Sequence, residues 1–202
     1  MKTLTVVAVL AATLTVVACD QSSGTQSQPT AEAPAPKPKI TPEERAKIVQ
    51  AATAGMSLDR DKMESISFYS VKGDRWVGTG LTLYVSVPDD ASPILRIMPR
   101  YSGDSWIFFK SMKVMADSVI VYDKQYEYLK MKRDNGGGMV YERIDYAAQP
   151  DDIEAMRKIA NAKSVTIRLS GDDKREDFDL DVSAQKKMQR VLKAYDDMAT
   201  LQ

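Results

Sequence analysis

The spacing of hydrophobic residues changes along the chain, and each spacing predicts a different kind of structure. Residues 3–17 are an uncharged run rich in Val, Ala and Leu. Residues 20–39 contain no large apolar side chain and consist mainly of Ser, Gln, Thr, Ala and Pro. From residue 41 onward, helical and strand-like patterns follow one another. We therefore expect one folded domain over residues 41–202, preceded by two segments that belong to no core.

The domain should begin with a helix and continue into strands. Thr41, Pro42 and Glu44 have the spacing of a capping box with proline at the first helical position, and Gly55 suits the end of this helix. Short runs rich in β-branched and aromatic residues follow, separated by turns with Gly, Asp, Asn or Pro. They predict consecutive antiparallel strands at residues 65–71, 80–87, 94–101, 105–115, 118–122, 126–132 and 139–145.

The last third of the domain mixes helices with one hairpin. Helical spacing returns at residues 150–162 and again from residue 183. Between these helices lie two alternating segments whose apolar positions are Val165, Ile167, Leu169, Phe178, Leu180 and Val182. Matching the faces of the two segments places Arg168 opposite Asp179. We predict an α+β fold with a largely antiparallel meander sheet of about 7–9 strands. It has an N-terminal helix, one helix before the last hairpin and a C-terminal helix packed on the sheet.

Composition excludes several classes of chemistry. The 28 basic residues balance the 28 acidic ones, so no net field attracts nucleic acid. The chain has no histidine, which removes the commonest general base and zinc ligand. Its one cysteine, Cys19, leaves no internal disulfide and no cysteine-based metal site. We expect no cofactor, no metal and no nucleic-acid partner, and a domain that is not an enzyme.

The N-terminus has the layout of an export signal. Lys2 precedes the apolar run of residues 3–17, which at about 15 residues is shorter than the roughly 20 that a spanning helix needs. The residues at its end, Val16-Val17-Ala18-Cys19, resemble the lipobox of bacterial lipoproteins. That resemblance implies a signal peptide over residues 1–18 and acyl chains, palmitate among them, on Cys19, with membrane lipid as a partner.

The resemblance also implies a location. A spacer over residues 19–40 would separate the lipid from the domain, which should face the periplasm as a lipid-anchored part of the cell membrane. In many enterobacterial lipoproteins an aspartate directly after the cysteine retains the protein on the inner membrane. Asp20 therefore favours the inner membrane, while an outer-membrane location stays open.

Two short motifs invite a ligand interpretation that their surroundings do not support. Asp177, Asp179 and Asp181 have the odd spacing that opens a calcium loop, but Val182 and Met188 stand where its glycine and closing glutamate belong. A solvated strand face is the better interpretation. The glycine run at residues 135–138 lacks the Lys-Ser/Thr of a phosphate loop and predicts a turn.

Carboxylate pairs are the remaining catalytic candidates. Glu142 with Asp145, or Glu154 with Asp151, could serve as acid and base, although nothing in the sequence singles out either pair. The apolar segment Trp106-Ile107-Phe108-Phe109 predicts a strand covered on both faces, or alternatively one that lines a ligand groove.

A second resemblance covers most of residues 60–200. The segments that carry it are Ile66-Ser67-Phe68-Tyr69, Leu95-Arg96-Ile97, Asp104-Ser105-Trp106-Ile107-Phe108 and Ser164-Val165-Thr166-Ile167-Arg168-Leu169-Ser170-Gly171. Together they resemble an uncharacterised α+β domain of small exported and prophage-encoded bacterial proteins, with Leu169 where that family usually has an aromatic residue. The resemblance names no activity. We expect a non-catalytic domain that binds an envelope protein or peptide. Two alternatives remain open, a prophage-type superinfection-exclusion lipoprotein and a carboxylate-dependent hydrolase of cell-wall or glycan material.

Overall fold

The computed structural model describes residues 40–73 and 78–202. The signal peptide, Cys19 and the spacer up to residue 39 lie outside the described residues, so these assignments stay predictions. The described residues belong to one compact unit. Its elements in chain order are α1 (Pro42–Ala52), β1 (Met56–Asp61), β2 (Ile66–Val71), β3 (Gly80–Pro88), β4 (Ile94–Gly103), β5 (Ser111–Ala116), β6 (Val119–Gln125), the 3₁₀ turn η1 (Tyr128–Lys130), β7 (Lys132–Gly136), β8 (Met139–Arg143), β9 (Tyr146–Ala147), α2 (Pro150–Asn161), β10 (Val165–Ser170), β11 (Arg175–Asp179), α3 (Val182–Asp197) and the 3₁₀ turn η2 (Ala199–Leu201).

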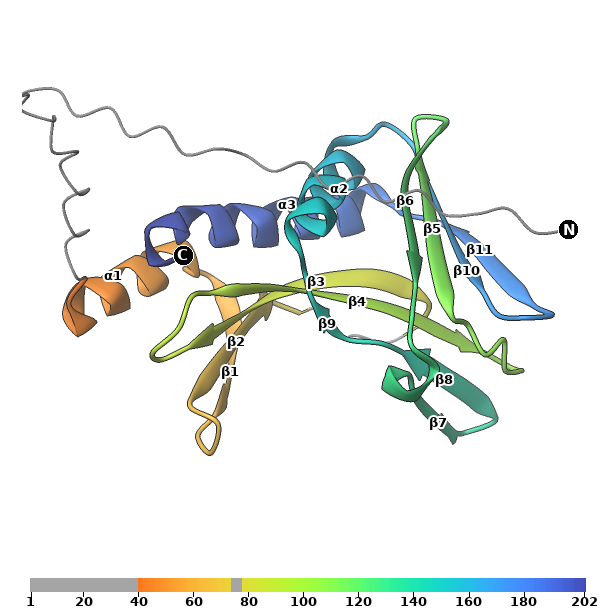
Figure 1. The fold of residues 1–202 in the computed structure, drawn as a ribbon, viewed down its shortest axis with the longest axis horizontal. Helices are drawn as coiled ribbons and strands as arrows, with labels where there is room; N and C mark the ends of the chain where they lie inside the picture. The colour runs from red at the N-terminus through yellow and green to blue at the C-terminus, as the bar shows by residue number, and fades with distance from the viewer. Residues whose placement is uncertain (1–39, 74–77) are drawn as a thin grey trace, which may run out of the picture. The chain divides into compact units, whose positions relative to one another are not determined.

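The predicted α+β class, the antiparallel sheet and the three helices are confirmed. The strands divide between two sheets (Figure 1). The larger sheet has seven strands in the order β1-β2-β3-β4-β8-β7, with β9 paired to β4. The smaller sheet has four strands in the order β11-β10-β5-β6. Every strand pair in both sheets is antiparallel.

The capping box predicted at the start of α1 is confirmed. The Glu44 amide donates to the Thr41 hydroxyl at 3.2 Å, and the Thr41 amide donates to the Glu44 carboxylate at 2.9 Å. These two bonds satisfy amides that a helix start otherwise leaves without partners. Only Val49 and Ala52 of this helix are buried. Packing therefore holds α1 weakly, and its contacts with neighbouring elements decide where it lies.

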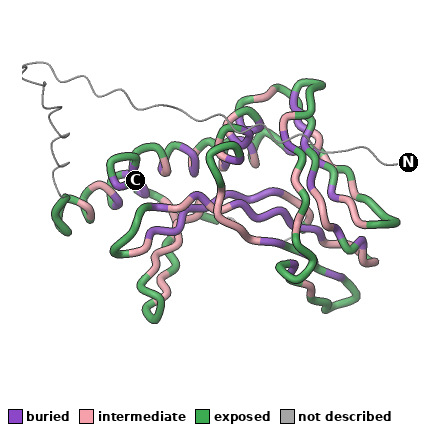
Figure 2. Tube along the Cα trace, viewed as in Figure 1, coloured by how far each residue is buried: buried purple, intermediate pink, exposed green. Residues whose placement is uncertain are grey.

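One hydrophobic core joins both sheets and the helices. Leu81, Leu83, Val85 and Val87 of β3 share one face of the larger sheet, and α3 packs on β3. Met112 and Val114 of β5, with their partners on β10, supply the inner face of the smaller sheet. Buried residues accordingly follow the middle of the larger sheet and continue into the smaller one (Figure 2).

The segment between β4 and β5 is not a strand, so the strand predicted at residues 105–115 is wrong in its first half. β5 begins at Ser111. Phe108 has φ +50°, a left-handed conformation that bulky residues rarely adopt, and its side chain is 49% exposed. Ile107 and Phe109 on either side of it are buried, as core residues should be. The connection turns here because its amides bond to a side chain instead of a neighbouring strand.

The register predicted for the last hairpin is also wrong. Arg168 lies opposite Asp177, and two nitrogens of its guanidinium donate to the two carboxylate oxygens of Asp177. Asp179 lies opposite Thr166 and accepts a hydrogen bond from its hydroxyl. The two registers differ by two residues. Such a shift keeps every side chain on its own face, so the alternation of apolar residues cannot distinguish them. The tight turn between the two strands sets the register, because the Gly171 amide donates to the Lys174 carbonyl and Ser170 pairs with Arg175.

Candidate functional site

The helix layer leaves part of the larger sheet uncovered. Leu58 of β1 lies opposite Tyr69 of β2, and Tyr69 lies opposite Val85 of β3, so the three side chains form one row on the helix-facing side. Exposure rises along this row, from 0% at Val85 through a partly buried Tyr69 to 58% at Leu58. The apolar face of the sheet therefore extends beyond the cover that α3 provides.

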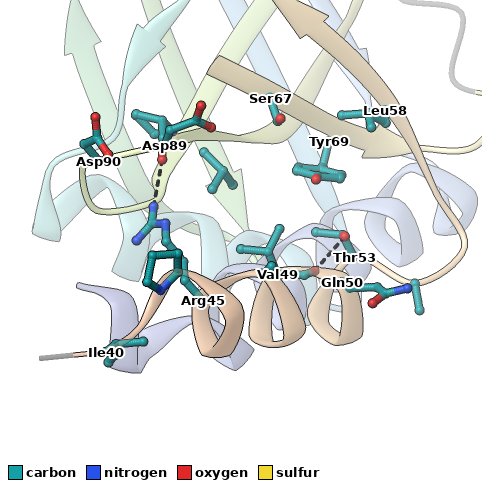
Figure 3. A pocket seen from close by; sticks show the side chains of 15 residues that line it. Ile40, Arg45, Val49, Gln50, Thr53, Leu58, Ser67, Tyr69, Asp89 and Asp90 are labelled. Atoms are coloured by element: carbon teal, nitrogen blue, oxygen red, sulfur yellow. Dashed lines mark hydrogen bonds between the residues drawn. The ribbon is translucent and has the colours of Figure 1, made fainter. Parts of the chain in front are cut away.

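The uncovered face and α1 form the two walls of a groove. Figure 3 shows Leu58, Ser67 and Tyr69 on the sheet side, facing Val49 and Thr53 on the helix side. The groove has a volume of about 840 Å³, within the roughly 300–1,000 Å³ usual for ligand pockets. Its remaining lining residues are Ile40, Pro42, Arg45, Ala46, Gln50, Ala54, Val87, Pro88, Asp89 and Asp90.

Charged groups stand at one end of this groove, and two of them hold the scaffold together. The Arg45 guanidinium donates to the carbonyls of Pro88 and Ala91 and so fixes α1 against the β3–β4 turn (Figure 3). Arg60 forms a two-bond ion pair with Asp89, at 2.8 and 2.7 Å, and holds the pKa of Asp89 below its ordinary value. The polar groups within the groove also bond locally, since the Thr53 hydroxyl donates to the Val49 carbonyl.

This arrangement can bind an apolar group. An apolar wall formed by Val49, Leu58 and Tyr69 can remove an apolar side chain of a partner from water. The carboxylates lining the groove, Asp89 and Asp90, lie together at one end, and Asp89 is paired with Arg60.

Glu142, a predicted catalytic candidate, is a structural carboxylate. Its side chain is completely buried, and it accepts hydrogen bonds from three consecutive backbone amides, those of Ile107 and Phe108 at 2.8 Å and Phe109 at 3.0 Å. Arg133 approaches the same carboxylate at 3.5 Å. Charged acceptors bind backbone amides strongly. Glu142 on β8 therefore fixes the connection through which the chain passes from the larger sheet to the smaller one.

The structure does not bring Glu142 and Asp145 together. Asp145 pairs with Arg96 at 3.0 Å and accepts a hydrogen bond from the Tyr84 hydroxyl, on the sheet face opposite to the one that Glu142 faces. Burial, followed by the hydrogen bond to Asp145, raises the pKa of Tyr84 above its ordinary value. The second predicted pair, Asp151 and Glu154, is exposed on α2.

A buried tyrosine cluster was not predicted from the sequence. Tyr122, Tyr126 and Tyr146 meet Asp152 and Lys124 where β6, β9 and α2 converge. The hydroxyls of Tyr122 and Tyr146 are 2.8 Å apart, and Tyr122 donates to Asp152 at 2.8 Å. Burial raises the pKa of all three tyrosines. Tyrosines on strands are too common for the sequence to mark this cluster, and none of the three lines the groove between α1 and the β1–β2 face.

The three aspartates that have the spacing of a calcium loop instead stabilise the last hairpin and the start of α3. Asp177 pairs with Arg168, Asp179 accepts from Thr166, and Asp181 caps α3 by accepting from the Ala184 amide at 2.7 Å. Within residues 40–73 and 78–202, no three acidic, histidine or cysteine side chains gather as a metal site. The glycine run forms the β7–β8 turn, as predicted, with Gly137 and Gly138 at positive φ.

Comparisons with known proteins add no assignment to this geometry. No protein-family model, no curated protein and no solved structure matches the chain. None of the helices in the described ranges is long and apolar enough to cross a membrane.

Proposed function

We propose that this chain is a lipid-anchored binding protein of the cell envelope. Cys19 carries the lipid, and the groove between α1 and the β1–β2 face takes an apolar segment of a partner protein or peptide. The observation that carries the proposal is the uncovered apolar row on the sheet, which ends in Leu58 at 58% exposure. Exposed apolar side chains that line a groove are a common feature of sites that bind proteins or other ligands.

The chemistry of the groove supports a non-catalytic role. Its walls are mainly apolar, while Arg45 and Asp89 at its end are engaged in fixing α1 and β1. The buried carboxylate Glu142, which a hydrolase could have used, is occupied by three backbone amides. A partner would gain affinity by burying apolar side chains against Val49, Leu58 and Tyr69.

Photocrosslinking in the producing bacterium tests the proposal. A photoreactive residue at Leu58 should give a discrete adduct with one envelope protein, because this position faces the groove. The same residue at Met63 is the matched control, since Met63 is 93% exposed at the turn of the same hairpin but does not line the groove. The Leu58 adduct should disappear with Tyr69→Asp, which places a charge on the apolar wall.

Two outcomes would contradict this function. Equal adducts from Leu58 and Met63 would mean that contact follows exposure alone. An adduct that survives Tyr69→Asp at full yield would mean that the partner does not use the apolar wall. Circular dichroism of Tyr69→Asp must match that of the parent protein, because Tyr69 also packs against the core.

A further inference from the structure

β1 leaves one edge of the larger sheet open beside the groove. It is the first strand of that sheet, and among the described residues it pairs with β2 alone (Figure 1). Its register with β2 runs without a shift through all six of its residues. β6, at the edge of the smaller sheet, has a register shift against β5, and such bulges hinder the pairing of a further strand. The regular edge of β1 can accept one.

The hydrogen bonds of β2 identify the backbone groups of β1 that face the open edge. The Asp89 amide donates to the Ser65 carbonyl at 3.1 Å, so the backbone of residue 65 faces β3. In an antiparallel ladder this direction repeats at every second residue, hence at residues 67 and 69 of β2. These two residues lie opposite Arg60 and Leu58. The amide and carbonyl groups of Leu58 and Arg60 therefore point away from β2, toward the open edge.

A neighbouring hydrogen bond supports this assignment. The Met56 amide, two positions before Leu58, donates to the Thr53 carbonyl at 3.0 Å, so it does not bond to β2. Within residues 40–73 and 78–202, no strand meets the backbone of Leu58 or Arg60 on the open side. Amides and carbonyls that face outward at every second residue are complementary to the backbone of another extended chain.

The two faces of β1 offer different side chains to such a chain. On the groove face, Leu58 is 58% exposed, and Arg60 is neutralised by its ion pair with Asp89. On the opposite face, Asp59 is exposed, and its carboxylate forms no ion pair with any described residue. A strand beside β1 would therefore meet an apolar side chain on one face and an uncompensated negative charge on the other. Opposite charges on facing residues stabilise a strand pair, and like charges destabilise it.

We infer that the partner binds as an extended segment that adds to the edge of β1 as a further strand. Its backbone bonds to Leu58 and Arg60, an apolar side chain enters the groove next to Leu58, and a basic side chain on the other face lies next to Asp59. Strand addition is a recurrent mode of peptide recognition, in which backbone bonds give affinity and alternate side chains give specificity. The inference rests on the proposed function of the groove and specifies the conformation and charge of the partner segment.

Peptide selection followed by hydrogen–deuterium exchange tests this mode of binding. The probes are short peptides of random sequence, displayed on phage and selected on the lipidated full-length protein in detergent. We expect the selected peptides to alternate apolar residues with Lys or Arg. A bound peptide should slow exchange at the amides of Leu58 and Arg60 at least about tenfold, as measured residue by residue. The Asp59 amide is the internal control, because it already bonds to β2 and should change little.

Changes to either molecule separate backbone pairing from side-chain contact. N-methylation of the peptide amide that donates to the Leu58 carbonyl should weaken binding roughly tenfold. N-methylation of the adjacent amide, which points away from β1, should change binding far less. Asp59→Lys should weaken binding of the basic peptides. Glu64→Lys is the matched control and should not, since Glu64 is exposed at the turn of the same hairpin.

Several results would overturn the inference. One is a failure to select alternating peptides, and another is unchanged exchange at Leu58 and Arg60 in the complexes. If these amides stay unprotected while Tyr69→Asp abolishes peptide binding, the groove binds side chains only, and the proposed function stands without strand addition. Protection of both amides in the protein alone, with a dimer in analytical ultracentrifugation, would assign the edge to a second copy of the chain. Failure of the proposed function is recognised separately, because the Leu58 photoadduct would then be absent from cells.

Discussion

The buried carboxylate of Glu142 accepts three backbone amides and so fixes the connection between the two sheets. The Glu142→Gln variant keeps one acceptor oxygen but turns an amide group toward an N–H donor and leaves Arg133 without a countercharge. We predict a loss of about 3 kcal/mol in the free energy of unfolding. Urea denaturation measures this loss, with Glu154→Gln as the control because Glu154 is exposed on α2. Equal midpoints for the two variants would refute a structural role of the charge.

Gly171 makes the other close contact with the same connection. A Cβ atom on Gly171 would lie 1.9 Å from the backbone carbonyl oxygen of Ile107. Backbone cannot move away as a flexible side chain can, so Gly171→Ala should destabilise the protein by about 3 kcal/mol. Gly136→Ala is the control, since nothing lies within 4 Å of its Cβ position. That variant should remain within about 0.5 kcal/mol of the parent. Thermal denaturation of both proteins makes the comparison.

These two residues also mark what the sequence alone could not show. Glu142 bonds to amides 33–35 residues away, and Gly171 contacts a carbonyl more than sixty positions earlier. A residue's type shows that it needs a hydrogen-bond partner or space, but it does not identify the partner. The sequence therefore predicted Glu142 as a candidate catalytic acid, whereas in the structure its carboxylate accepts hydrogen bonds from backbone amides.

At the scale of elements, two arginines hold α1 in place, Arg45 within the helix and Arg190 of α3. Arg190 of α3 donates to the carbonyls of Ala52 at 3.0 Å and Ala54 at 2.8 Å, at the negative end of the α1 dipole. Arg190→Met should loosen α1 while the sheets keep their stability. We expect faster amide hydrogen exchange over residues 44–54 and unchanged exchange in β3 and β4.

The control for this variant is Lys193→Met on the same helix, because Lys193 is exposed and pairs with Asp197 one turn away. Its exchange pattern should match that of the parent. A global increase of exchange in Arg190→Met would mean that α1 and the core unfold as one unit, and the groove would then have no wall that moves independently.

Local signals predicted the three helices and most strands, but they missed β1 and predicted a strand at residues 126–132, where the chain forms the 3₁₀ turn η1. The capping box at Thr41, the turn at residues 135–138 and the three helices each follow from neighbouring residues. The hairpin register and the non-strand conformation at Phe108 depend on loop closure and on a distant carboxylate. The groove could not be predicted from the sequence for the same reason. Arg45 and Arg190 position α1 through hydrogen bonds to residues 43 and 138 positions away in the chain.

For the whole molecule, acid stability should depend on Asp152, where helix α2 meets both sheets. Burial would raise the pKa of Asp152, but Lys124, the Gln149 amide and Tyr122 outweigh it and hold the pKa below its ordinary value of 3.8. A lowered pKa in the folded state means that the unfolded chain takes up the proton first. The stabilisation is therefore present above about pH 4 and is lost as pH falls through the folded-state pKa.

Asp152→Asn should accordingly flatten the acid dependence of the free energy of unfolding, as measured by urea denaturation at a series of pH values. Tyr122→Phe keeps Lys124 and should lose only part of that dependence. An Asp152→Asn protein whose stability falls as steeply as that of the parent below pH 4 would assign the acid sensitivity to other carboxylates.

Attachment to the membrane is the prediction on which the proposed location of the protein depends. Because Cys19 is the only thiol in the chain, fatty-acid labelling of the protein has a single cysteine target. Cells fed an alkyne fatty acid should incorporate it into the parent protein and not into Cys19→Ala, as detected by click chemistry on the purified chain. Mass spectrometry of the labelled protein should show that residues 1–18 have been removed.

Asp20→Ser, which leaves the cysteine in place, serves as the control and should keep full labelling. If its membrane fraction changes, position 20 directs sorting. Label in Cys19→Ala at the parent level would refute the anchor.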